Sequence, residues 1–169
     1  MSSFDIIRHR RSVRTFDGRA LRAEDAEKIM EYASALENPY GLPITWKILN
    51  AKEHGLSSPV IAGTDTYITG KMKRAPHAEE AFGYTFERIV IFAEAMKLGT
   101  TWIAGTMNRD AFEKAMELDD GEVMPCISTR ADQRAILTRP AGTCRRSTSG
   151  SPFATSPAGW KKWNGTPAS

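Results

Sequence analysis

The sequence is poor in cysteine, histidine and long apolar runs. Its 169 residues include only two cysteines, Cys126 and Cys144, which form no Cys-x-x-Cys pair and no disulfide framework. The most apolar run, residues 89–93, is far too short to span a bilayer, and no apolar segment of a signal peptide follows the N-terminus. These absences predict a protein of the reducing cytoplasm with no membrane contact, in which Cys126 is a small buried apolar residue.

Motifs of several common chemistries are also missing. The stretch DTYITGKM has Asp65 and Met72 where a phosphate-binding P-loop needs glycine and Ser or Thr, and no GxGxxG is present. His77 with Glu79 and Glu80 fits the first turn of a helix better than a metal site, because no second histidine follows at helical spacing. We therefore expect no metal and no catalytic acid, base or nucleophile among the side chains.

The charge of the chain is divided unevenly between two regions. Residues 1–128 carry 16 basic and 19 acidic side chains, whereas residues 129–169 carry seven basic side chains against one acidic. The second region is rich in Ser, Thr, Pro and Gly and has no apolar periodicity, so we expect a folded domain over 1–128 and a disordered basic tail over 129–169.

Two explanations of the tail remain open. It is either a natural basic extension or the product of a reading-frame shift near Ser128. The frameshift is favoured, because residues 123–128 begin a buried element whose continuation is missing.

Apolar spacing predicts a mixed fold for residues 1–128. Apolar residues recur at helical spacing in residues 23–36, 77–98 and 108–118, and Gly99 follows the longest of these segments as a suitable helix stop. Strand-like patterns occupy residues 44–50, which are expected to be half-buried, and also 66–69, 100–103 and 123–128. A short helix is expected to end near Arg10.

Positive charge is concentrated around one hydroxyl in the stretch RRSVR, residues 10–14. In an extended chain Ser12 and Arg14 lie on the same face, and Arg10 can approach from the end of the preceding helix. Two guanidinium groups and a hydroxyl suit a phosphate monoester. A solvated basic surface or a nucleic-acid patch are the alternatives, and the second is disfavoured because no aromatic residues interleave the arginines.

Three segments together resemble the FMN-dependent nitroreductase family: IIRHRRSVRTFDGRAL, ENPYGLPITW and KLGTTWIAGTMNRDAF. The resemblance covers residues 4–128. It implies an α+β fold of helices around a mostly antiparallel sheet, in a homodimer that binds FMN at the subunit interface. Family members continue past residue 128 with more sheet, basic residues near the phosphate and an arm around the partner, none of which residues 129–169 match.

The resemblance also assigns cofactor-binding roles. By position it implies two groups of residues. The first group would hold the FMN phosphate, the ribityl chain and the pyrimidine edge. The second group would cover one flavin face and present backbone N–H groups towards N5. The first group is Arg10, Arg11, Ser12 and Arg14, and the second is Trp102, Ile103, Ala104 and Gly105. Asn38 lies where the family often has an amide near the ring edge, within a local pattern that departs from the commoner one.

Three functions are consistent with these features. The resemblance implies a flavoenzyme that passes hydride from NADH or NADPH through flavin N5 to a nitroaromatic or quinone. The second possibility is an inactive or cofactor-poor fragment of such an enzyme, truncated or frameshifted. The third is a binding module whose basic tail contacts nucleic acid, which would make its binding strongly salt-dependent.

Overall fold

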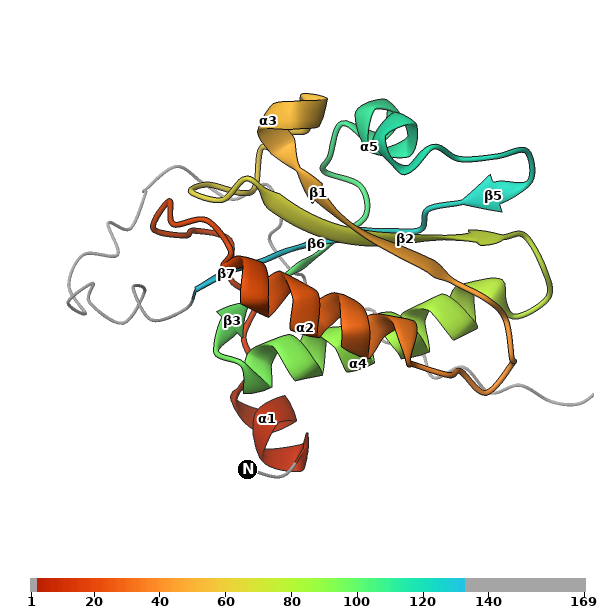
Figure 1. The fold of residues 1–169 in the computed structure, drawn as a ribbon, viewed down its shortest axis with the longest axis horizontal. Coiled ribbons are helices and arrows are strands. Elements are labelled where there is room, and N and C mark those ends of the chain that lie inside the picture. The colour runs from red at the N-terminus through yellow and green to blue at the C-terminus, as the bar shows by residue number, and fades with distance from the viewer. Residues whose placement is uncertain (1–2, 133–169) are drawn as a thin grey trace, which may run out of the picture. The chain divides into compact units, whose positions relative to one another are not determined.

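A computed structural model describes residues 3–132 of the chain (Figure 1). All of them belong to one compact unit, Met1–Arg139. Residues 133–169 lie outside the described residues, and so do the predictions made for them, a disordered tail and contacts with nucleic acid.

A central antiparallel sheet organises this unit. Its strands follow the order β1-β2-β6-β4, with β5 also paired to β2, while β3 and β7 form a separate antiparallel pair. The strands are β1 (Thr45–Asn50), β2 (Thr66–Lys73), β3 (Leu98–Gly99), β4 (Trp102–Ile103), β5 (Glu122–Val123), β6 (Ile127–Thr129) and β7 (Ala131–Asp132). This arrangement confirms the α+β class with a mostly antiparallel sheet.

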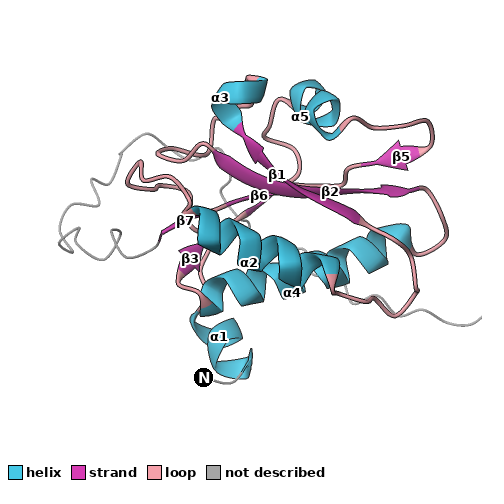
Figure 2. Cartoon of the chain, viewed as in Figure 1, coloured by secondary structure: helices cyan, strands magenta, loops and turns pink. Residues whose placement is uncertain are grey.

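Helices cover both faces of the sheet. The helices α2 and α4 lie on one face, and α3 and α5 lie on the other (Figures 1 and 2). The helices are α1 (Ser3–His9), α2 (Ala23–Ser34), α3 (Ala51–His54), α4 (Ala78–Ala95) and α5 (Arg109–Met116). The predicted helices and strands are thus found, with ends that shift by a few residues.

Each face of the sheet has its own apolar core. Trp46 of β1 packs with Phe82 and Phe86 of α4, whereas Leu49 of the same strand belongs to the opposite cluster with Phe112 of α5. Only Trp46 and Leu49 of β1 are buried, so the strand is half-buried as expected, although the alternation did not predict that Leu49 is buried on the second face. Burying such side chains contributes about 1.5–3 kcal/mol each.

Two local expectations were wrong. Helix α4 ends at Ala95, and Lys97, not Gly99, takes the left-handed conformation (φ 64°). Gly99 instead lies in β3. The expected strand over 123–128 is split into β5 and β6, because Pro125 has no N–H to donate to a ladder.

Residues 129–132 continue the fold beyond the expected domain boundary. Thr129 pairs with Tyr67, and the Arg130 N–H donates to the Thr66 carbonyl at 3.2 Å. The Arg130 side chain is fully buried, and none of its three nitrogens has a hydrogen-bond partner among the described residues. Burial lowers the pKa of Arg130 to about 9. A buried charge without a partner is strongly destabilising.

Candidate functional site

The arginine segment (residues 10–14) lies against the chain that leads into β4. Ser12 forms a parallel bridge with Thr100, and the Val13 N–H donates to the Thr100 carbonyl at 2.9 Å. Gly99 permits this approach, since a Cβ added there would lie only 3.0 Å from the Val13 Cβ. Because β4 begins two residues later at Trp102, the two predicted groups of site residues meet in space.

The side chains of the arginine segment retain unused hydrogen-bond donors. Arg11, Ser12 and Arg14 are exposed, and Arg10 is half-buried. Arg10 Nη1 is buried without a hydrogen-bond partner, and Arg10 Nε lies 3.7 Å from Glu87 Oε1. Within residues 3–132, no salt bridge joins Arg11 or Arg14 to a carboxylate. Orphaned and exposed guanidinium donors on one segment fit an anionic group such as a phosphate.

Trp102 is linked to the arginine segment through a shared partner on α4. Its side chain is 40% exposed, and its ring meets Phe86 edge to face with centroids 4.7 Å apart. Its indole N–H donates to Glu87 Oε2 at 3.0 Å. Glu87 therefore contacts both Arg10 and Trp102, a link that the sequence did not predict, because one surface glutamate on a long helix carries no distinguishing signal.

The residues after Trp102 differ in what they can offer to a ligand. Ile103 is 3% exposed and pairs with Ile127, so its side chain belongs to the core and only its backbone is available. Ala104 and Gly105 are exposed. A Cβ added at Gly105 would meet no atom within 4 Å, and the residue is not left-handed. The open space over this backbone fits the close approach of a flat ring.

The loop after β4 is held by side chains that the sequence analysis did not identify. Arg109 Nη2 donates to the Ala104 carbonyl at 2.8 Å, and Ser58 Oγ donates to the Thr106 carbonyl at 2.5 Å. Arg109 is the first residue of α5, and Ser58 lies in the loop before β2. These contacts fix the backbone on both sides of Gly105.

Asn38 is occupied by its own turn. Its amide nitrogen donates to the Leu42 carbonyl at 2.7 Å, and its oxygen accepts from the N–H groups of Tyr40 and Leu42. It lines a cavity of about 450 Å³ together with Leu36 and Trp46, and none of the eight predicted cofactor-binding residues lines that cavity. Asn38 therefore shapes a loop, and its oxygen and one of its two amide N–H donors are used within that turn.

The structure also shows where the other residues considered in the sequence analysis lie. The P-loop-like stretch is strand β2, and His77 lies at the start of α4 with its Nδ1 3.3 Å from Glu80. Cys126 is buried, which raises the pKa of its thiol to about 12. Within residues 3–132, no group of metal-ligating side chains comes together and no helix is long and apolar enough to cross a membrane.

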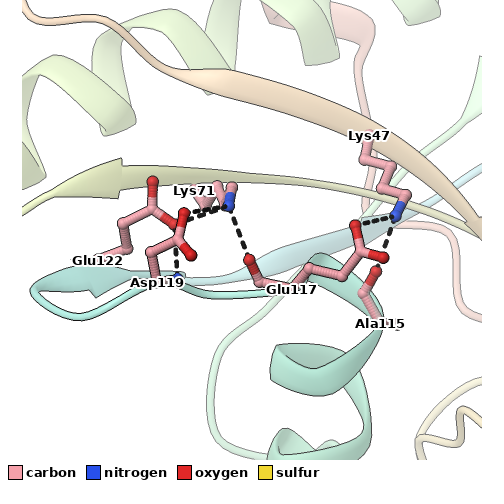
Figure 3. Close-up of polar contacts among 6 residues, drawn as sticks. All are labelled: Lys47, Lys71, Ala115, Glu117, Asp119 and Glu122. Atoms are coloured by element: carbon pink, nitrogen blue, oxygen red, sulfur yellow. Dashed lines mark hydrogen bonds and ion pairs between the residues drawn. The ribbon is translucent and has the colours of Figure 1, made fainter.

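Lys47 and Lys71 form a second group of cations, the lysine network, and both are paired with carboxylates of the chain (Figure 3). Lys71 Nζ lies 2.7 Å from both the Glu117 carbonyl and Glu122 Oε2, and 3.7 Å from Asp119 Oδ2. Lys47 Nζ donates to the Ala115 carbonyl at 3.0 Å and pairs with Glu117. The hydrogen bond to Glu122 raises the pKa of Lys71. The network fastens the connection between α5 and β5 to the sheet, and the chain itself supplies an acceptor for each of the three donors of Lys71.

Comparison with known proteins agrees with this geometry. A family described as "Putative TM nitroreductase" matches residues 3–130. No curated protein sequence gives a significant match.

Several solved structures share the fold at low sequence identity. An FMN-dependent nitroreductase of Clostridium difficile is 15% identical with a TM-score of 0.65, over 78% of this chain and 87% of its own. A Desulfovibrio desulfuricans protein described as a "putative nitroreductase in complex with fmn" is 17% identical with a TM-score of 0.65, over 90% and 98%. A nitroreductase-like protein of Bacillus cereus is 20% identical with a TM-score of 0.63, over 86% and 91%. With a family match across more than half of its length and the same fold as these structures, the chain belongs to the nitroreductase family.

Proposed function

We propose that this protein is an FMN-dependent oxidoreductase. The observation that supports the proposal is the bridge between Ser12 and Thr100, which joins the arginine segment to the chain that leads through Trp102 to the exposed backbone of Ala104 and Gly105. FMN carries a phosphate at one end and a flat ring system at the other. The arginine segment offers donors that suit the phosphate, and the open backbone of Ala104 and Gly105 suits the ring. Family membership supports the same cofactor.

Two groups of residues would bind different parts of FMN. Arg10, Arg11, Ser12 and Arg14 would bind the phosphate, the ribityl chain and the pyrimidine edge through charge-assisted hydrogen bonds. Trp102 and the backbone of residues 103–105 would cover one face of the ring. A positive guanidinium near the pyrimidine stabilises negative charge on a reduced flavin.

The proposed reaction needs little from the side chains beyond orientation. When bound, FMN supplies the two-electron chemistry by which hydride from NADH or NADPH reaches a nitroaromatic or quinone acceptor. The protein would orient both substrates in turn over the same exposed face, which predicts ping-pong kinetics.

A homodimer is part of the proposal. Large apolar side chains are exposed on α1 and α4, where Phe4 is 77%, Ile7 53% and Tyr84 46% exposed. A second copy would cover this surface and complete the site. Light scattering coupled to size exclusion tests it, and a purely monomeric FMN-loaded protein would remove this part of the proposal.

The cofactor proposal is tested by loading the purified full-length chain with FMN. We expect a yellow protein whose flavin fluorescence titration saturates at one FMN per chain. Arg14→Ala is expected to weaken binding roughly tenfold or more, because a charge-assisted hydrogen bond contributes about 1.5–3 kcal/mol. Arg74→Ala, an exposed arginine just after β2, is the matched control and should bind normally. A colourless protein that takes up no FMN from excess would refute the proposal.

A second candidate is a cofactor-poor derivative of such an enzyme. The observation that favours it is the buried, unpartnered guanidinium of Arg130 in the strand region next to Thr100. A fold weakened there would hold residues 10–14 less firmly. Poor retention of FMN by the wild-type chain, corrected by an apolar residue at position 130, would establish this candidate.

A further inference from the structure

Arg109 joins two backbone segments through one guanidinium. Its Nη2 donates to the Ala104 carbonyl at 2.8 Å and its Nη1 to the Met124 carbonyl at 2.8 Å. Longer contacts of 3.4 Å reach the Pro125 carbonyl and Glu113 Oε1. The loop after β4 is thereby fixed to the segment that leads into β6.

The bond to Ala104 also orients the next N–H group. The Ala104 carbonyl and the Gly105 N–H belong to one planar trans peptide, in which the two groups point in opposite directions. With the carbonyl held by Arg109, the Gly105 N–H must point away from the Arg109 guanidinium. No described residue accepts a hydrogen bond from it, and the space beside Gly105 is open.

Charge strengthens this effect. A carbonyl that accepts a hydrogen bond from a cation is polarised, and the N–H of the same peptide becomes a better donor. The planar fork of arginine can reach two carbonyls in a fixed geometry, which the single ammonium of lysine cannot reproduce.

We propose that Arg109 is a positioning residue for the cofactor, and that its hydrogen bond to the Ala104 carbonyl aims and polarises the Gly105 N–H towards the flavin ring. This inference rests on the proposed function. It assigns to Arg109 no contact with the cofactor or the substrate.

The test compares Arg109→Met with Arg109→Lys and with Lys47→Met in the full-length protein. Lys47 donates to the Ala115 carbonyl at the opposite end of α5, so Lys47→Met weakens the same helix without touching the loop. The readouts are the FMN dissociation constant, the visible spectrum of bound oxidised FMN, and hydrogen exchange of the peptide containing residues 104–106.

For Arg109→Met we expect FMN to bind roughly 5–10-fold more weakly, which corresponds to one lost hydrogen bond. We also expect a shifted flavin spectrum and faster exchange at residues 104–106. Arg109→Lys should recover part of the exchange protection but not the spectrum. Lys47→Met should leave all three readouts as in the wild type.

Two outcomes overturn the inference: wild-type binding and spectrum in Arg109→Met, or equal changes in Lys47→Met. Failure of the wild-type chain itself to bind FMN would overturn the proposed function instead. In that case, hydrogen exchange at residues 104–106 that is equally fast in the cofactor-free wild type and in cofactor-free Arg109→Met would also show that Arg109 does not hold the loop after β4.

Discussion

The cations of the arginine segment and the cations of the lysine network serve opposite purposes. Lys71 has three acceptors within 3.7 Å for its three donors, all supplied by the chain itself (Figure 3). In the arginine segment, Arg10 keeps a buried nitrogen without a partner, while Arg11 and Arg14 stay exposed. Charge that the fold neutralises stabilises the fold. Charge that it leaves unmatched in a preformed place is available to a ligand.

The largest expected effect is a loss of FMN affinity when the arginine segment, but not the lysine network, is changed. The double variant Arg10→Ala, Arg14→Ala should weaken FMN binding by roughly 10²–10⁴-fold, since each lost charge-assisted contact costs about 1.5–3 kcal/mol. Fluorescence titration measures the affinity, and thermal unfolding without FMN should be nearly unchanged.

Lys71→Met gives the opposite pattern and serves as its control. We expect normal FMN affinity with a lower midpoint of unfolding, because Glu122 and the Glu117 carbonyl lose their donor. If Lys71→Met lost FMN as completely as the arginine variant, the distinction between the two regions would fail.

Arg130 extends the comparison to a buried cation whose nitrogens have no hydrogen-bond partner among residues 3–132. Arg130→Met should raise the free energy of unfolding by about 1–4 kcal/mol, the gain commonly found when apolar side chains replace buried charge. Urea denaturation measures it, with the exposed Arg74→Met expected to stay within about 0.5 kcal/mol of the wild type. A loss of stability in Arg130→Met would mean that the guanidinium has a partner outside the described residues.

The smallest expected effect is the acid sensitivity of the lysine network. The Asp119 N–H and then Lys71 lower the pKa of Glu122 below its usual 4.5. A carboxyl group with a lowered folded pKa stabilises the fold above its unfolded pKa, and that contribution disappears as the pH falls through the folded value. Between pH 6 and pH 3, roughly the range that spans this loss, Glu122→Gln should therefore lose less stability than the wild type. Equal slopes of stability against pH in both proteins would contradict the assigned role of Glu122.

Local patterns predicted the parts of the molecule that depend on neighbouring residues. Alternation placed β1, a run of β-rich residues placed the first half of β2, and helical spacing placed α2 and α4. The extended geometry of residues 10–14 indicated which side chains share a face. The same local reasoning failed at Gly99. A glycine after a helix is usually a stop, but here its missing side chain is needed for contact with Val13.

What the sequence could not show depends on contacts between distant segments. Glu87 gains its place only because α4 passes between Arg10 and Trp102. Arg109 matters because Ala104 and Met124 meet at its guanidinium. The burial of Leu49 on the second face of β1 likewise follows from the position of α5, far along the chain.

The bridge between Ser12 and Thr100 has a consequence for biosynthesis. A nascent chain could assemble the proposed cofactor site only after residue 100 has left the ribosome and the following strand, β4, has joined β6, which ends at Thr129. Flavin capture would thus be a late event in the maturation of this protein, and amino-terminal fragments that stop before the bridge should emerge as apoprotein.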